Sequence, residues 1–195
     1  MLYQINVPDL NQPGIFANQN NYLSSVTGTT VNYFTGCKFS VKQDTANTWT
    51  YSIQAVSDNP MYLYMQSNAG YADVYVNNNR ISDYFSERKT GALYLGDFTT
   101  GQTVTVHVVA ADDGNTYSQT FTDIVQLDVA ALKNTTASLQ KHGLKIKKQN
   151  GNSISGEIIL DNGQNQIMTS IPYDEGWTIY IDGKKADYTK YAGSF

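Results

Sequence analysis

The sequence predicts an all-β protein made of two sandwich-like or jelly-roll-like units, the second of them incomplete, with one connecting α-helix. Three observations predict this class. Short stretches alternate apolar and polar residues with the period of a half-buried strand. Asn, Asp and Gly separate these stretches at regular intervals, as turns do. Finally, the 195 residues include 15 tyrosines and are 41% hydrophobic but only 15% charged, a composition that suits pleated surfaces around a packed core.

The alternation is clearest after Cys37, whereas the first part of the chain is irregular and rich in Asn. In that first part we expect a short strand at 2–7 and one helical turn at 22–26. The later strands are each bounded by turn residues. They are predicted at 49–56, 61–66, 72–76, 104–110, 117–121, 144–148, 154–160, 166–171 and 177–181.

One segment has helical instead of alternating spacing. Asp123 is the predicted N-cap, and Lys141 with Gly143 provides the expected end. Between them, apolar and small residues recur every three or four positions, at Val125, Val129, Leu132, Thr136 and Leu139. The sequence therefore predicts a connecting helix at 123–142, between a first β unit at 1–122 and a second at 143–195.

A short repeated sequence relates these two units. Residues 74–80 (VYVNNNR) match residues 179–185 (IYIDGKK), and each stretch is a strand that ends in a tight turn. The first copy continues into the predicted strand at 104–110, but the counterpart of that strand would lie beyond Phe195. We therefore expect the second unit to be truncated, with an unpaired strand edge. Two outcomes follow: the edge pairs with a second copy of the chain in a homodimer, or residues 187–195 stay poorly ordered.

Charge and motif patterns exclude several functions. A net charge of −4, with Lys145, Lys147 and Lys148 as the only dense basic run, argues against nucleic-acid binding. The single cysteine, Cys37, has no partner for a disulfide within the chain, and we expect a small buried side chain there.

Catalytic patterns are also missing from the sequence. Asp174 and Glu175 are neighbours, so they do not face each other as the two carboxylates of a glycosidase do. Asp112 and Asp113 do not have the spacing of a calcium loop, and neither His107 nor His142 belongs to a zinc motif. We therefore predict no catalytic residue, no metal site and no cofactor in this chain.

The supply of aromatic residues near the C-terminus suggests one binding role. Aromatic faces stack on sugar rings, and polar neighbours orient the hydroxyl groups. The candidate glycan-binding residues are Tyr173, Trp177, Tyr180 and Asp182. Tyrosine is also a favoured strand residue, so ordinary sheet packing remains the alternative explanation for these side chains.

Two segments resemble a known family. Residues 16–28 (FANQNNYLSSVTG) and 169–184 (TSIPYDEGWTIYIDGK) are similar to elements of YfhO-type bacterial membrane proteins. The resemblance implies an extracytoplasmic β region in Gram-positive cells, placed before the last transmembrane helix of a protein with many such helices. It also implies a relation to membrane glycosyltransferases that use lipid-linked sugars and glycosylate teichoic acids. Their catalytic acid lies in loops near the membrane helices, so the resemblance places no catalytic residue on this chain.

Three functions follow as hypotheses. The first is a non-catalytic accessory domain of such a glycosyltransferase, with a cell-wall glycan or teichoic acid and the parent's own transmembrane region as partners. The second is a structural or protein-interaction module without a glycan role. The third, an independent glycan hydrolase, requires facing carboxylates that the sequence does not offer. No run of about 18 apolar residues occurs, so we expect the chain as given to be soluble, with the parent anchoring it at the outer face of the membrane.

Overall fold

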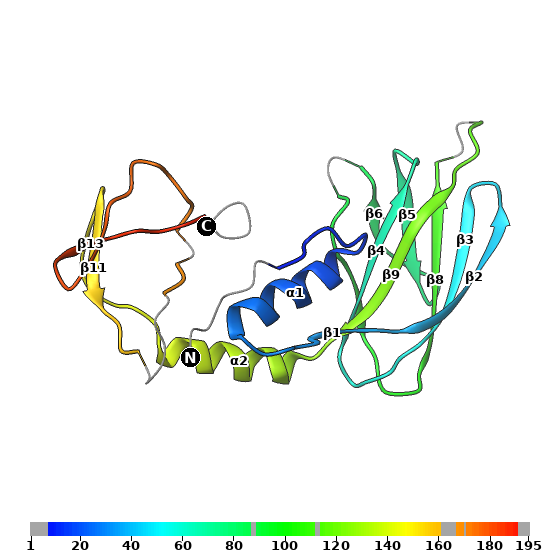
Figure 1. Cartoon of the computed structure of the whole chain (residues 1–195). Helices are drawn as coiled ribbons and strands as arrows, with labels where there is room; N and C mark the ends of the chain where they lie inside the picture. The colour runs from blue at the N-terminus through cyan, green and yellow to red at the C-terminus, as the bar shows by residue number, and fades with distance from the viewer. Residues whose placement is uncertain (1–7, 87–88, 112–113, 161–166, 170, 191–195) are drawn as a thin grey trace. The chain divides into compact units, whose positions relative to one another are not determined.

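The computed structural model describes residues 8–86, 89–111, 114–160, 167–169 and 171–190 (Figure 1). Strands dominate it, and all of their pairings are antiparallel, which confirms the all-β class. The elements are α1 (Ile15–Thr27), β1 (Phe34–Gly36), β2 (Lys38–Thr45), β3 (Thr48–Gln54), β4 (Pro60–Ser67), β5 (Ala72–Val76), β6 (Asn79–Tyr84), β7 (Leu93–Asp97), β8 (Thr103–Ala110), β9 (Gln119–Leu127), α2 (Val129–Lys141), β10 (Lys145–Asn150), β11 (Ser153–Glu157), β12 (Ile179–Ile181) and β13 (Lys184–Ala186).

The described residues form two compact units. The sandwich unit comprises residues 11–20 and 32–134, and the hairpin unit comprises the described residues among 1–10, 21–31 and 135–195. The division passes through both helices. The predicted domain limits, at 122/123 and 142/143, stay a prediction.

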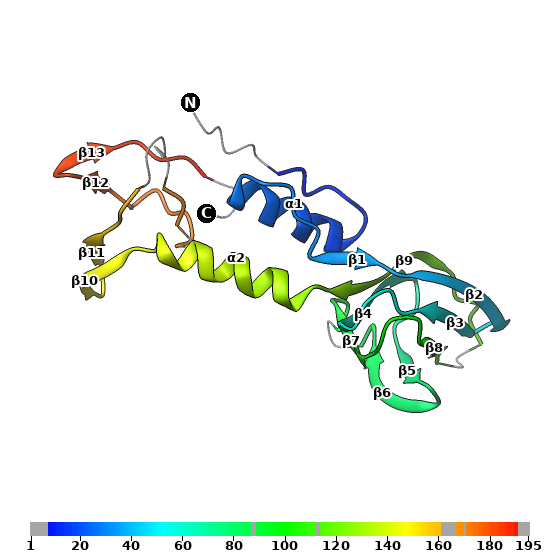
Figure 2. The same ribbon diagram turned by 90° about the horizontal axis from the view of Figure 1, so that it is seen from below.

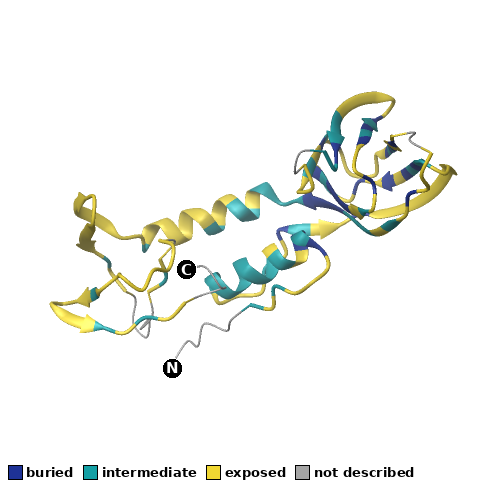
Figure 3. Cartoon of the chain, turned by 90° about the horizontal axis from the view of Figure 1, so that it is seen from above, coloured by how far each residue is buried: buried dark blue, intermediate teal, exposed yellow. Residues whose placement is uncertain are grey.

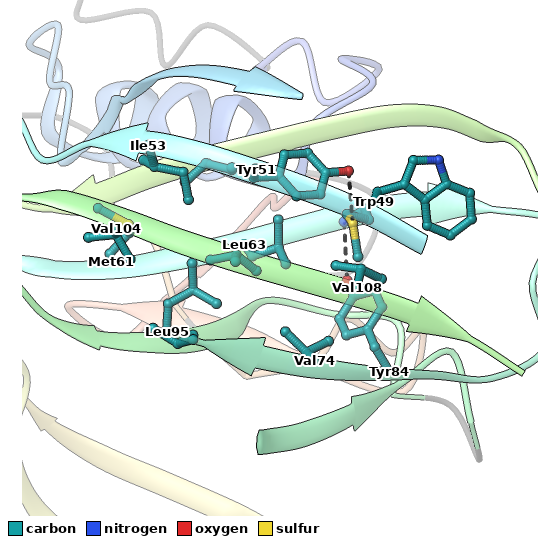
Figure 4. Close-up of a cluster of buried hydrophobic side chains, with 14 of the residues drawn as sticks. Trp49, Tyr51, Ile53, Met61, Leu63, Val74, Tyr84, Leu95, Val104 and Val108 are labelled. Carbon is teal, nitrogen blue, oxygen red and sulfur yellow. Dashed lines mark hydrogen bonds between the residues drawn. The ribbon is translucent and has the colours of Figure 1, made fainter. Parts of the chain in front are cut away.

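Two sheets face each other in the sandwich unit. One has the strand order β1-β9-β4-β7 and the other the order β2-β3-β8-β5-β6. Their facing side chains form one core, in which Leu63 from the first sheet and Tyr51 and Val106 from the second are fully buried (Figure 4). The alternation seen in the sequence explains this arrangement, because every second residue of a strand points to the same face. In β8, for example, Val104, Val106 and Val108 are buried while the residues between them are not.

One buried polar side chain binds the loop that connects the two sheets. Gln126 of β9 is 1% exposed, and its amide nitrogen donates to the carbonyl oxygens of Ser57 and Asn59, each at 2.7 Å. Its oxygen accepts from the backbone N–H groups of Val56 and Ser57, at 2.6 and 3.0 Å. The β3–β4 loop therefore supplies hydrogen-bond partners to both polar atoms of the buried Gln126 side chain, as buried polar groups require.

The connecting helix exists but begins later than predicted. Asp123 lies inside β9, paired with Tyr64 of β4, and is not an N-cap. The cap is Asp128, whose Oδ1 accepts from the N–H of Ala131 at 2.8 Å. The prediction was wrong because the apolar residues here fit either a strand or a helix. Ile124 and Val125 form part of a strand and are buried in the sandwich unit.

The N-terminal helix α1 is much longer than the single turn predicted at 22–26, at 13 residues. Phe16 anchors it, buried in a small cluster with Tyr64 and Val125. Asn side chains then tie the helix to backbone groups elsewhere in the chain. The amide of Asn20 bonds to both the N–H and the carbonyl of Phe34, at 3.1 and 3.0 Å. The strand predicted at 2–7 lies outside the described residues.

The strands of the hairpin unit form two separate two-stranded sheets, β10–β11 and β12–β13. The strand predicted at 154–160 ends at Glu157 as β11. Residues 167–169 and 171, the described part of the strand predicted at 166–171, are not in a strand. No described residue of this unit is buried, in contrast to the core of the sandwich unit (Figure 3). Two-stranded sheets of this kind leave most of both faces exposed.

Candidate functional site

The two segments with similar sequence, 74–80 and 179–185, form the same kind of hairpin, β5–β6 and β12–β13. Figure 2 shows these four strands from below. The two central turn residues of the β12–β13 hairpin, Asp182 and Gly183, have φ angles of 50° and 74°. The corresponding residues of the β5–β6 hairpin, Asn77 and Asn78, have φ angles of 46° and 68°. Positive φ at both positions is the signature of the type I′ turn, which Asn, Asp and Gly tolerate best. The residue types thus produce the same turn in both units.

Just before β12, the segment from Asp174 to Trp177 forms a tight turn. The Asp174 carboxylate accepts from the N–H of Gly176 at 2.7 Å, and the Asp174 carbonyl accepts from the N–H of Trp177 at 3.2 Å. The hydroxyl of Tyr188, beyond β13, reaches the carbonyl oxygens of Asp174 and Trp177 at 3.1 and 2.8 Å. A Cβ at Gly176 would lie 2.9 Å from the Asp174 carboxylate oxygen, so a larger residue there would make that carboxylate shift.

A hollow of about 520 Å³ lies beside this turn. Trp177 contributes an indole surface, Asp174 a carboxylate, and Asn152 of the β10–β11 turn an amide. The full lining is Gly151, Asn152, Ile171, Pro172, Asp174, Gly176 and Trp177. An aromatic surface with a carboxylate and an amide around it matches the chemistry of a sugar ring, which offers C–H groups on its faces and hydroxyls at its edge.

Two tyrosines lie next to the lining residues in sequence or in space. The rings of Tyr173 and Tyr188 are 5.8 Å apart between centroids, and Lys190 Nζ lies 5.5 Å from the centroid of Tyr173. The latter arrangement is that of a cation–π contact. The pKa of the Tyr188 hydroxyl is raised by desolvation and by the neighbouring Tyr173, Asp174 and Glu175. This hydroxyl therefore stays protonated and acts as a donor.

The four residues predicted to bind glycans separate into two groups. Trp177 lines the hollow. Tyr173 lies in the chain between the lining residues Pro172 and Asp174 but is not itself part of the lining. Tyr180 lies on β12, 65% exposed and paired across the strands with Lys185, and it does not line the hollow. Asp182 occupies the turn, where its positive φ gives it a backbone role. The sequence did not identify Asn152, which enters the site from a different hairpin.

A second group of polar side chains lies on the outer face of the five-stranded sheet. The Thr50 hydroxyl donates to the Asp44 carboxylate and lies 2.8 Å from Nδ1 of His107. Thr50 and His107 are direct partners in the β3–β8 register, so the register alone accounts for their contact. The pKa of Asp44 is lowered by its bonds to Lys42 and Thr50. A carboxylate stabilised in its charged form is a poor general base.

Two further predictions concern cysteine and metal chemistry. Cys37 is a free, buried thiol, as expected, and burial raises its pKa to about 11. It is therefore a thiol and not a nucleophilic thiolate at neutral pH. Among the residues that the structure describes, no three His, Cys, Asp or Glu side chains gather as metal ligands would.

Comparison with protein families now adds an identity. Residues 5–195 match the family described as bacterial membrane protein YfhO. The chain belongs to the YfhO family. This confirms the resemblance predicted from residues 16–28 and 169–184, and it places the chain in a family of membrane proteins. Among proteins with curated descriptions, none matches the chain. In the part of the YfhO-family chain that the structure describes, no helix has the length and apolar character needed to cross a bilayer.

Proposed function

We propose that this chain is a non-catalytic, extracytoplasmic domain of a YfhO-family membrane protein, and that it contacts a cell-envelope glycan such as a teichoic acid. In this proposal the membrane-embedded part of the protein carries out glycosyl transfer from a lipid-linked sugar. The β domain holds the acceptor polymer close to the membrane surface. Its own residues bind and orient the polymer and do not take part in bond breaking.

The observation that supports this proposal is the hollow beside Trp177. It combines an indole face with the Asp174 carboxylate and the Asn152 amide, within a turn that the Tyr188 hydroxyl fixes from behind. The bonds from Tyr188 fix the backbone at two of the lining residues, Asp174 and Trp177, so little backbone order has to be gained on binding. The hollow is shallow and lies at the surface, so the affinity should be weak, with a Kd near ~1 mM, about −4 kcal/mol.

A titration of the purified chain with teichoic acid tests the binding. We expect chemical-shift changes at the Trp177 indole N–H and at the backbone of 151–152 and 174–177, and loss of these changes in Trp177→Ala. The matched control is Tyr94→Ala, which removes an exposed aromatic ring from the sandwich unit and should leave binding unchanged. No response of the native chain at saturating polymer would remove the glycan role.

The side of the membrane is tested separately, with the full-length protein in intact cells. Cys37 is buried, so it gives little background with a membrane-impermeant maleimide. Thr116→Cys introduces a thiol at an exposed position of the sandwich unit. We expect it to react in intact cells, with the unsubstituted protein as control. Labelling only after the membrane is permeabilised would contradict the extracytoplasmic placement.

A second function, a protein-interaction module, is favoured by a different observation. Aliphatic side chains of the hairpin unit lie at the surface, with Ile146, Ile159 and Ile181 about half exposed or more. Exposed apolar residues in such number are often covered by a partner protein. This function predicts that Ile159→Ser weakens association with the membrane-embedded part of the protein while glycan binding by the isolated chain is unchanged.

A further inference from the structure

The strand β2 is an edge strand whose core-facing side is not covered. It forms one end of the sheet order β2-β3-β8-β5-β6, and all eight of its residues are exposed. Among them are two large apolar side chains, Phe39 at 38% exposure and Val41 at 52%. A long, exposed edge strand with apolar side chains presents vacant backbone groups that another strand can pair with.

The register shows toward which side these apolar residues point. Phe39 pairs with Ile53 and Val41 pairs with Tyr51, and both β3 partners are fully buried between the two sheets. Directly opposed residues in neighbouring strands lie on the same face. Phe39 and Val41 therefore extend the inner apolar face by one strand, and the ring of Phe39 contacts the ring of Tyr51 edge-on at 5.8 Å between centroids.

The charges on the other face of β2 fit a second copy of the same strand. Lys38 stands near one end and Asp44 near the other, and the sequence from one to the other is KFSVKQD. In an antiparallel pair centred on Val41, Ser40 lies opposite Lys42, and each Lys38 lies beside the Asp44 of the other copy. Asp44 stands at the register shift between Gln43 and Thr45, where the regular ladder ends, and its bonds to Thr50 and Lys42 hold its carboxylate on this outer face. On the inner face, Val41 meets its own counterpart, and Phe39 meets Gln43. Opposite charges that face each other stabilise such a pair, and no like charges are opposed in this register.

We propose that two copies of this chain associate through β2, in antiparallel register centred on Val41, so that the two five-stranded sheets become one continuous sheet. The interface is symmetric, because each copy contributes the same surface. A single strand pair buries little area, so the dimer is weak for free chains. Confinement of the parent protein to a membrane raises the effective concentration and favours it.

Sedimentation velocity over a range of concentrations tests this association. We expect the native chain to shift reversibly from monomer to dimer as concentration rises. Val41→Lys places two like charges at the centre of the pair and should raise the dimer Kd by roughly tenfold or more. A native chain that stays monomeric up to about 1 mM, well above the range of most specific complexes, would overturn the proposal.

A charge exchange tests the register. Lys38→Glu alone places two carboxylates opposite each other at both ends of the pair, and Asp44→Lys alone places two ammonium groups there. Each variant should therefore dimerise less than the native chain. Mixed together, the two variants pair opposite charges at both ends, and the mixture should regain the native Kd. A variant that failed to fold would not be restored by mixing. Two weak variants whose mixture stays equally weak would overturn the register.

Two matched controls separate β2 from the other exposed edges. Ile81→Lys alters β6, the opposite edge of the same sheet, and Ile181→Lys alters β12 in the hairpin unit. Both residues are exposed, as Val41 is. We expect both variants to dimerise as the native chain does. If Ile181→Lys removes the dimer and Val41→Lys does not, association occurs through β12 and the proposal for β2 is wrong.

Discussion

The hairpins β5–β6 and β12–β13 begin from nearly the same sequence and reach different environments. Both close with a two-residue loop, between Val76 and Asn79 in the first and between Ile181 and Lys184 in the second. In the first, β8 pairs with β5 along its whole length. In the second, no strand among the described residues pairs with β12 other than β13. As a result Val76 is 6% exposed and Ile181 is 47% exposed.

The turn of each hairpin and the burial of its strands therefore have separate causes. Two residues that accept positive φ are sufficient for the turn, so a hairpin forms wherever they occur between alternating strands. Burial needs a third strand and an opposing sheet, which residues far away in the chain provide. Four predictions test this separation of local turn formation from long-range burial.

The largest expected difference is between the two tryptophans. Trp49 lies on β3 in the core at 5% exposure, while Trp177 lies beside β12 at 37%. Trp49→Ala removes a large buried side chain and should lower the free energy of unfolding of the sandwich unit by about 4 kcal/mol. Trp177→Ala, in the hairpin unit, should lower the free energy of unfolding by less than about 1 kcal/mol. Urea unfolding followed by circular dichroism measures both, and equal losses would contradict the contrast.

Thiol reactivity gives the next largest contrast. Burial raises the pKa of Cys37 to about 11 from 9.0, so at neutral pH its thiolate fraction is lower by about a hundredfold. A folded-state pKa above the unfolded value keeps the thiol protonated up to that higher pH. The protection is therefore complete below pH 9 and is lost as pH approaches 11. We expect iodoacetamide to modify Cys37 at least about 100 times more slowly in the native chain than in urea.

The matched variant for this experiment is Ile181→Cys, which adds a thiol to the exposed hairpin. We expect one fast phase of modification from residue 181 and one slow phase from Cys37. Equal rates for the two thiols would show that the core of the sandwich unit exposes Cys37 as readily as the β12–β13 hairpin exposes residue 181.

Equivalent strand residues should also differ. Val74 and Ile179 occupy the same position in the two copies, but Val74 is fully buried and Ile179 is half-buried. Val74→Ala should cost the sandwich unit about 2 kcal/mol, from lost burial and the remaining cavity. Ile179→Ala, although it removes more atoms, should cost about 0.5 kcal/mol. Thermal unfolding of the two variants checks the order, and a larger effect at Ile179 would mean that β12 is covered in solution.

The smallest effect concerns the turns themselves. Asn78→Gly gives the first hairpin the glycine that the second has at Gly183, and it relieves the cost of a side chain at φ 68°. We expect a gain of about 0.5 kcal/mol for Asn78→Gly and a loss of about 1 kcal/mol for Gly183→Ala. Asn79→Ala, just outside the positive-φ positions, is the control. A loss of stability in Asn78→Gly would indicate that the Asn78 side chain has a role beyond the turn.

The sequence predicted several strands whose pattern is local, although not β2, β6, β7 or β13. Strands such as β3, β5 and β8 follow from alternation, and the tight turns after β5 and β12 follow from their Asn, Asp and Gly residues. The start of α2 was predicted at Asp123 because Val125 fits the helical spacing. In the structure, Val125 lies in β9 and is buried in the sandwich unit, so the helix begins only after this strand. Helix α1 was missed because asparagine is a poor helix former, and its Asn side chains are satisfied by distant backbone groups such as those of Phe34.

The candidate site was only partly predictable for a related reason. Aromatic richness near the C-terminus pointed to Trp177 and Tyr173. Nothing local indicated that Asn152, from the β10–β11 turn, would line the same hollow as Asp174, since that meeting depends on how distant hairpins come together. Tyr180 and Asp182 follow the aromatic and turn patterns, yet they lie outside the lining of the hollow.

The path of the chain from β9 into α2 gives the sandwich unit a mechanical property. β9 lies between β1 and β4, paired with both, and continues through Asp128 directly into α2. Tension applied to the chain through α2 therefore acts along an interior strand. Its hydrogen bonds to two neighbours are loaded together in shear and do not open one after another as in a peeled edge. Gln126, bonded to the β3–β4 loop, adds four hydrogen bonds to the same strand. A pull along β9 through α2 therefore has to break the pairing with β1 and β4 and the bonds of Gln126 to the β3–β4 loop.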